Sequence, residues 1–125
     1  MAINYKKLIE IARALKGKNS SGRCFHVSVV LNKSKILSIG FNKYKTHPQT
    51  KNYAYHRFAG IHSELDAVLK LGMDDCSGLT IINIRVDKNN QICDSKPCKG
   101  CSDLIQKIGF KKVIYTNNIG NFEEE

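Results

Sequence analysis

The feature that most constrains the fold is the run LTIINIRV, residues 79–86. It is rich in β-branched residues, which favours a strand, and its apolar side chains occupy both sets of alternating positions. Such a strand can be buried on both faces, and a sheet with two buried faces needs other elements packed on each side. The run therefore indicates a layered domain.

Helical patterns supply the covering layers. Apolar residues recur at helical spacing in residues 3–16, and further helices are expected at about 62–71 and at 98–108, ended by Gly72 and Gly109. The runs 24–31 and 35–42 alternate and are joined by NKS, which predicts a hairpin with Phe25, Val27 and other apolar residues on one face. Residues 86–93 read as a turn with a short return, and 111–117 as a strand. This order predicts a three-layer α/β/α domain whose mixed sheet has four or five strands and helices on both faces.

Length and composition agree with one soluble domain. The chain has 125 residues with 42% hydrophobic and 25% charged residues, so we expect a single domain over 1–125 with a flexible tail at 118–125. No run of 18 apolar residues occurs and the first residues form a charged helical pattern, which predicts neither a membrane span nor a signal peptide. A cytoplasmic location follows. In that reducing compartment, paired cysteines indicate metal binding or catalysis rather than disulfides.

Charge is distributed unevenly along the chain. Residues 1–60 hold twelve lysines and arginines and one acid, a net +11, whereas residues 61–125 hold eight and ten, a net −2. A basic half of this kind attracts anionic partners such as nucleotides or nucleic acid, although a solvated lysine-rich face would look the same.

Two short motifs carry titratable and metal-binding side chains at expected helix starts. His62 and Glu64 open the helix at 62–71, and KPCKGC places Cys98 and Cys101 at the start of the next helix. Successive helix N-termini of an α/β domain gather at one edge of the sheet, so the two motifs can meet. One nitrogen and two sulfurs suit tetrahedral zinc, and three protein ligands leave a fourth position open for water. Glu64 would then stand beside that water as a proton carrier.

The pattern H-x-E, followed by P-C-x-x-C, resembles the zinc-dependent cytidine and deoxycytidylate deaminase superfamily, over residues 3 to about 117. The resemblance implies a cytidine-deaminase-like fold, one catalytic Zn²⁺ held by His62, Cys98 and Cys101, and Glu64 as general acid/base. It implies that Asn42 holds the sugar or base edge and that Ser63, where the family often has alanine, contacts the base through its backbone. It further implies a homo-oligomer and conversion of cytosine to uracil in a free nucleotide or nucleoside such as dCMP.

Several alternatives stay open. The basic half also suits a deaminase of cytosine or adenine in single-stranded DNA or RNA. A non-catalytic module could use the same ligands for a structural zinc site, which would have a fourth protein ligand. PCKGC alone could be a redox pair. Cys93 could join His47 or His56 in a second metal site, or be a small apolar filler like Cys24 and Cys76.

Overall fold

The computed structural model describes residues 3–16, 24–42, 62–72, 76–97 and 99–125. In chain order its elements are α1 (Tyr5–Lys16), β1 (Cys24–Asn32), β2 (Lys35–Phe41), α2 (Ser63–Leu71), β3 (Thr80–Asp87), β4 (Ile92–Cys93), α3 (Lys99–Ile108), β5 (Lys112–Thr116) and β6 (Phe122–Glu124). No helix among these residues is long and apolar enough to cross a membrane.

The strands form one mixed sheet of six strands in the order β2-β1-β3-β5-β6, with β4 paired to β3 beside this path. Among the strand pairs of the described residues, β3 and β5 run parallel and the others run antiparallel. The β1–β2 hairpin turns at Lys33, which adopts a left-handed conformation with φ 57°. The predicted hairpin, the short return at β4 and the mixed α/β fold class are thus confirmed.

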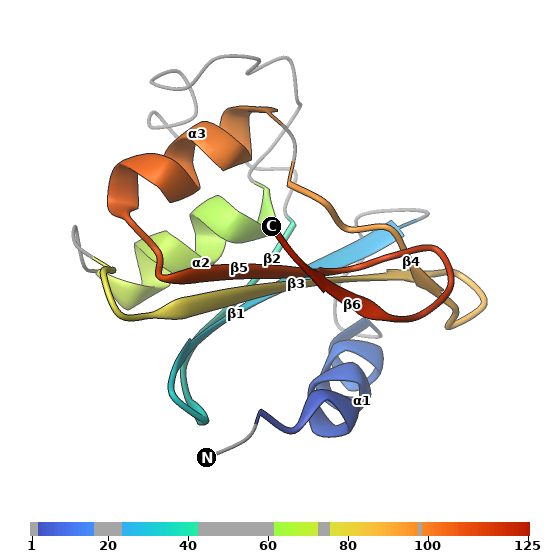
Figure 1. Cartoon of the computed structure of the whole chain (residues 1–125). Coiled ribbons are helices and arrows are strands. Elements are labelled where there is room, and N and C mark those ends of the chain that lie inside the picture. Colours follow the sequence, from blue (N-terminus) through green and yellow to red (C-terminus); the bar gives the residue numbers. More distant parts are fainter. Residues whose placement is uncertain (1–2, 17–23, 43–61, 73–75, 98) are drawn as a thin grey trace.

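Helices cover both faces of the sheet, with α1 on one face and α2 and α3 on the other (Figure 1). On the α1 side, Leu8 and Ala12 pack against alternating residues of β1 and β3, including Val27 and Ile84. On the opposite side, Ala67 of α2 packs with Val30 and Ile81. β3 contributes to both cores, as its continuous apolar run predicts, and β1 does so as well through Val30.

The sheet has one strand more than the four or five expected. The extra strand, β6, lies within residues 118–125, the segment expected to be a tail, and pairs with β5. Asn117 makes this possible, because its Oδ1 accepts hydrogen bonds from the backbone N–H groups of Ile119 (3.1 Å) and Asn121 (2.9 Å), and Gly120 turns the chain at φ 84°. The turn returns the chain along β5.

Candidate active site at the starts of α2 and α3

The first turn of α2 presents His62, Ser63 and Glu64. His62 is the N-cap residue, with φ −74° and ψ 156°, and its side chain makes no capping hydrogen bond. Histidine is not a preferred N-cap residue, because Ser, Thr, Asp and Asn accept the orphan backbone N–H groups better. The imidazole is therefore placed by the helix start but is not used to cap it.

Gly40 lets α2 lie directly on β2. A Cβ atom at this position would lie 2.2 Å from the backbone nitrogen of Ala67 and 2.4 Å from the carbonyl oxygen of Ser63. Only glycine fits a helix backbone this close. The contact fixes the first turn of α2 against the end of β2.

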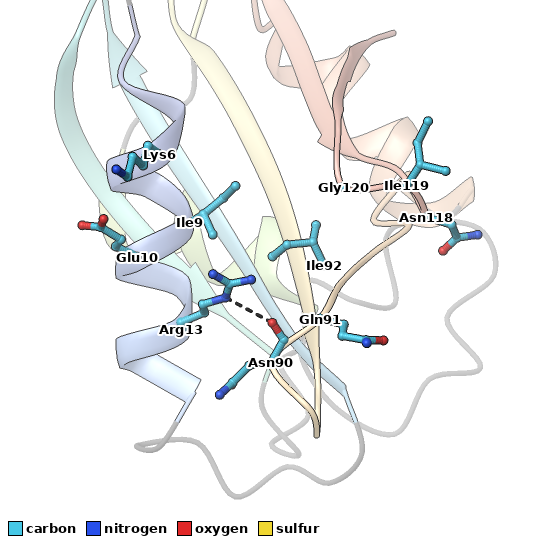
Figure 2. Close-up of a pocket in the computed structure, with 10 residues that line it drawn as sticks. All are labelled: Lys6, Ile9, Glu10, Arg13, Asn90, Gln91, Ile92, Asn118, Ile119 and Gly120. Atoms are coloured by element: carbon cyan, nitrogen blue, oxygen red, sulfur yellow. Dashed lines mark hydrogen bonds between the residues drawn. The ribbon is translucent and has the colours of Figure 1, made fainter.

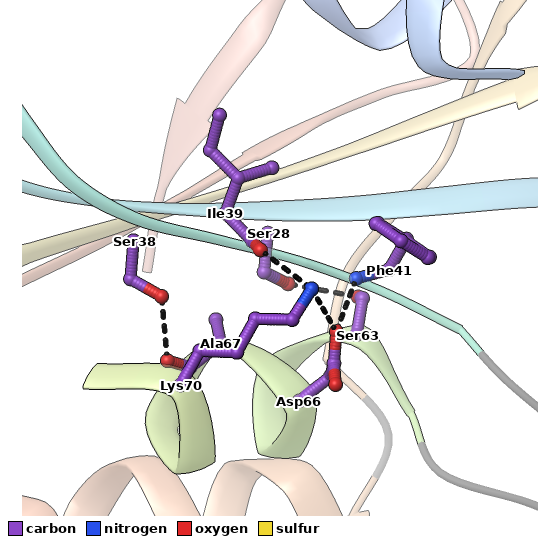
Figure 3. Close-up of polar contacts among 8 residues, drawn as sticks. All are labelled: Ser28, Ser38, Ile39, Phe41, Ser63, Asp66, Ala67 and Lys70. Atoms are coloured by element: carbon purple, nitrogen blue, oxygen red, sulfur yellow. Dashed lines mark hydrogen bonds and ion pairs between the residues drawn. The ribbon is translucent and has the colours of Figure 1, made fainter. Parts of the chain in front are cut away.

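Polar contacts hold the same helix on the same strand (Figure 3). The Asp66 carboxylate accepts a hydrogen bond from the backbone N–H of Phe41 (3.0 Å) and pairs with Lys70 at 3.0 Å. Lys70 also donates to the carbonyl of Ile39 (3.2 Å) and lies over the Phe41 ring, 4.2 Å from its centroid. These contacts tie α2 to β2.

α3 begins after Pro97 and carries Cys101, which is buried, in its first turn. The segment before the helix is fixed by Ser95, whose N–H donates to the carbonyl of Thr116 (2.8 Å) and whose hydroxyl accepts from the N–H of Thr116 (2.8 Å). Leu104 of α3 packs against Leu65 of α2. The two helices therefore lie together on one face with their first turns adjacent.

The two helix starts meet, as the sequence predicts. Cys101 Sγ lies 3.3 Å from Nδ1 of His62. The ligand atoms of His62, Glu64 and Cys101 all lie within 4.8 Å of one another. The His62 nitrogen, the Glu64 carboxylate and the Cys101 sulfur therefore lie close together, although His62 and Cys101 are 39 residues apart in the sequence.

The donor set fits zinc. In a tetrahedral zinc site, bonds of about 2.3 Å to sulfur and about 2.0–2.1 Å to nitrogen place these two ligand atoms roughly 3.6 Å apart. The 3.3 Å between Cys101 Sγ and His62 Nδ1 is close to that value, and Nδ1 is the ring nitrogen that faces Cys101. Cys98, the third expected ligand, lies outside the described residues.

Glu64 is buried and both of its carboxylate oxygens accept hydrogen bonds. Asn83 donates to Oε2 from its side-chain nitrogen at 2.9 Å, and the Ser63 hydroxyl donates to Oε1 at 3.1 Å. Burying a carboxylate costs free energy unless polar partners replace water. Asn83 and Ser63 provide these partners.

Of the two expected substrate-binding residues, Ser63 lies between His62 and Glu64, and Asn42 follows the strand that α2 contacts. The Ser63 side chain points into the protein, with its Oγ 2.8 Å from Oγ of Ser28. Asn42 directly follows β2, and its Oδ1 accepts a hydrogen bond from the backbone N–H of His26 (3.0 Å), which fixes the orientation of its amide. Asn42 therefore lies just beyond Phe41, the residue held by Asp66 of α2.

The structure describes the side chains of two of the remaining cysteines, Cys76 and Cys93. Cys76 is fully buried among apolar residues, as expected for a packing residue. Cys93 is partly buried on β4, with its sulfur 3.9 Å from an Asp87 carboxylate oxygen and 3.6 Å from the Gln91 carbonyl. Its possible metal partners His47 and His56 lie outside the described residues, as does the Cys24 side chain.

Sequence reasoning missed the residues that support this site from the sheet. Ser28, Gly40, Asp66 and Asn83 were not singled out. Asn83 carried a usable signal, because it is an uncharged polar residue between two isoleucines in the run IINIRV. A buried amide in a strand interior needs a specific partner.

A second concave region lies on the opposite face of the sheet. This groove of about 810 Å³ lies between α1, the β3–β4 turn and the β5–β6 turn (Figure 2). Arg13 Nε donates to the carbonyl of Asn90 at its edge, at 3.1 Å. Of the described residues, those that line it include neither His62 nor Glu64 nor Cys101, so it is separate from the metal cluster.

Solved structures of known proteins share this fold. The dCMP deaminase from the cyanophage S-TIM5, in complex with dCMP and dUMP, has a TM-score of 0.62 at 19% identity, over 91% of this chain and 81% of that chain. Cytidine deaminase from Mycobacterium leprae has a TM-score of 0.63 at 17% identity, over 98% and 94%. Cytidine deaminase from Burkholderia pseudomallei has a TM-score of 0.59 at 19% identity, over 98% and 92%.

Sequence identities of 17–19% establish a shared fold alone. The family has to be established from the sequence. No curated protein matches it at a significant level. Residues 3–117, however, match the family model described as the cytidine and deoxycytidylate deaminase zinc-binding region. Because that match covers nearly the whole domain, the chain belongs to the zinc-binding cytidine and deoxycytidylate deaminase family.

Proposed function

We propose that this protein is a zinc-dependent hydrolase that converts cytosine to uracil in a free cytidine or deoxycytidine nucleotide or nucleoside, such as dCMP. The observation that carries the proposal is the meeting of His62, Glu64 and Cys101 within 4.8 Å at two adjacent helix starts. In this proposal His62 Nδ1, Cys101 and Cys98 hold one Zn²⁺. A bound zinc ion lowers the pKa of a coordinated water toward neutrality and so supplies the nucleophile.

Glu64 is assigned to proton transfer. Deamination joins a water oxygen to C4 of cytosine, breaks the C4–N bond and releases ammonia. The reaction moves a proton from the water to the ring nitrogen and another to the departing amine, and a buried carboxylate at this position can carry both. Both Glu64 oxygens accept hydrogen bonds from Asn83 and Ser63, which supports a proton carrier beside the metal rather than a fourth ligand.

Asn42 and the Ser63 backbone are assigned to the substrate. Asn42 lies at the end of β2, the strand against which the first turn of α2 rests through Gly40. Its amide is oriented by the N–H of His26, so it can meet a sugar or base edge in a fixed geometry. The choice of a free nucleotide is supported by the cyanophage relative, which is seen with dCMP and dUMP.

A second candidate substrate is single-stranded nucleic acid, favoured by the net charge of +11 in residues 1–60. An extended basic surface suits a polyanion, and binding that depends on phosphates weakens steeply with salt. Activity on an oligonucleotide that falls steeply with salt would favour this substrate over a free nucleotide.

Product mass spectrometry tests the proposal on a panel of cytidine, dCMP, dCTP, dAMP and a mixed-sequence single-stranded oligonucleotide. We expect uracil product from a free cytosine nucleotide or nucleoside, and none from the Glu64→Ala protein, which should still hold zinc. His62→Ala and Cys101→Ala should lose zinc by elemental analysis, as should wild type treated with a chelator. Full turnover by Glu64→Ala, or full zinc content in the ligand variants, would refute the assigned roles.

A further inference from the structure

Asn83 is a buried amide at the centre of the apolar strand β3. It is 3% exposed, and its neighbours Ile82 and Ile84 are fully buried. Its side-chain nitrogen donates to Oε2 of Glu64 at 2.9 Å, from a strand that lies beneath α2. An amide in this environment is costly unless both of its ends are paired.

Ser28 pairs the other end of the amide. In the antiparallel β1–β3 ladder Ser28 lies directly opposite Asn83, so the two side chains share a face of the sheet. The Ser28 hydroxyl donates to Oδ1 of Asn83 at 2.7 Å. Because an ionised carboxylate can only accept, Nδ2 is the end of the amide that faces Glu64, and Oδ1 is left to accept from Ser28.

Ser63 closes a ring of four buried side chains. Its Oγ lies 2.8 Å from Oγ of Ser28 and 3.1 Å from Oε1 of Glu64. Figure 3 shows the Ser28–Ser63 contact between β1 and the first turn of α2. The ring joins β1, β3 and α2, and it contacts both oxygens of the Glu64 carboxylate.

The backbone of Asn83 also anchors the other half of the site. Its carbonyl accepts a hydrogen bond from the Ser95 hydroxyl at 2.7 Å. Ser95 lies in the segment that leads to α3 and Cys101, and Thr116 ties it to β5. One residue of β3 thus contacts Glu64 through its side chain and the approach to α3 through its backbone.

We propose that Asn83 and Ser28 are positioning residues of this deaminase: Asn83 fixes the Glu64 carboxylate, and Ser28 holds the Asn83 amide in place through its Oδ1. The inference rests on the proposed function, because it assigns the ring to the proton carrier of that reaction. A carboxylate that must reach a water, a ring nitrogen and an amine has to be held within a fraction of an ångström. The ring supplies this restraint from the rigid sheet.

Two substitutions test the proposal in the zinc-loaded protein. Asn83→Asp keeps the shape but replaces the donor to Glu64 by an acceptor, and it should lower kcat on the order of 100-fold. Ser28→Ala leaves the amide without the donor to its Oδ1 and should lower kcat about 10-fold or more. In both variants we expect KM within about threefold of wild type and an unchanged zinc content, because neither residue touches substrate or metal in the proposal.

Ser38→Ala is the matched control. Ser38 is also a buried serine, and its hydroxyl also donates to α2, at the Ala67 carbonyl (2.8 Å), but it does not join the ring. Its loss should lower the melting temperature and leave kcat within about twofold of wild type, since it removes a hydrogen bond between β2 and α2 that does not involve Glu64 or its partners. Equal losses of kcat in Ser28→Ala and Ser38→Ala would overturn the positioning role.

A thermal readout tests the pairing without turnover. In the wild-type background Asn83→Asp places two carboxyl groups face to face and should lower the melting temperature clearly. In a Glu64→Gln background, the Gln amide can donate to the new carboxylate, and most of the loss should be recovered. An equal loss in both backgrounds would overturn the Asn83–Glu64 contact.

The outcomes separate this inference from the proposed function. Wild-type turnover with full kcat in Asn83→Asp and Ser28→Ala would overturn the positioning role and leave the function standing. A wild-type protein that deaminates nothing in the panel would overturn the function and the positioning role together, while the thermal test would still report on the contact.

Discussion

Replacing Gly40 with alanine should displace α2, the helix whose first turn carries Ser63 and Glu64. The added Cβ would lie 2.2 Å from the Ala67 nitrogen and 2.4 Å from the Ser63 carbonyl oxygen. Both are backbone atoms, so no side-chain rotation can relieve the contact. Reaching the 3.4 Å at which ordinary contact begins requires α2 to move by roughly 1.2 Å, the difference between 3.4 and 2.2 Å.

The displacement predicts two measurable losses. Overpacking of this kind costs about 1–3 kcal/mol of unfolding free energy. A shift of about 1 Å in His62 and Glu64 relative to Cys101 can cost on the order of 100-fold in kcat. We expect Gly40→Ala to show a lower melting temperature, a weaker hold on zinc during dialysis against a chelator, and a kcat reduced by that order.

Gly120→Ala is the control that distinguishes a loss of stability from a displacement of α2. Gly120 has φ 84° and open space around the position of a Cβ, so alanine there costs about 1–2 kcal/mol of backbone strain and moves nothing near the site. Its melting temperature should fall to a similar degree while kcat and zinc retention stay at wild-type values. The reasoning is refuted if Gly40→Ala melts and turns over like wild type, or if Gly120→Ala loses the same activity.

Two further predictions concern the supports around the site. Asp66→Ala should lower the unfolding free energy by about 1–3 kcal/mol, because it removes the buried acceptor of the Phe41 N–H. Lys70→Met should lower it by less than about 1 kcal/mol, because the Lys70 side chain is 40% exposed. Denaturant unfolding measures both, and equal losses would contradict this reasoning. The backbone N–H of Gln91 above all holds the pKa of the Asp87 carboxyl below its usual 3.8. A lowered folded pKa contributes stability that is present above the unfolded pKa and lost as pH falls through the folded pKa, so NMR should show Asp87 titrating below 3.8 and Asp87→Asn should lack this acid-dependent loss.

The elements with strong periodicity were predictable because their own side chains specify them. The run at 79–86 is buried on both faces in the structure, and the helices begin and end within two residues of the expected positions. The three-residue strand β6 was not predicted as a strand, because its position depends on the turn at Asn117 and on pairing with β5. A short strand of this kind carries too little pattern of its own.

The candidate site also contains residues that a local sequence pattern predicts and residues that only the fold brings together. His62, Glu64 and Cys101 stand in two local motifs, each at a helix start, and helix starts on one face of a sheet are brought together by the fold. Ser28 and Asn83 are 55 residues apart, and only the strand register sets them opposite one another. A one-residue slip would turn each side chain to the other face, so no local pattern could reveal the pair.

The ring also explains why polar residues occupy positions that an apolar core would fill at lower cost. Ser28, Ser63, Glu64 and Asn83 are all buried, and each breaks the local rule for its position in a strand or helix. Losing one member leaves each of its partners with one contact fewer, at about 1–3 kcal/mol for a buried donor or acceptor that is not satisfied again, so no member can be replaced alone without loss. Such mutual dependence offers nothing to stability that well-packed apolar side chains would not supply. It does offer a carboxylate held from two sides beside His62 and Cys101, which is what the proposed proton transfer by Glu64 requires.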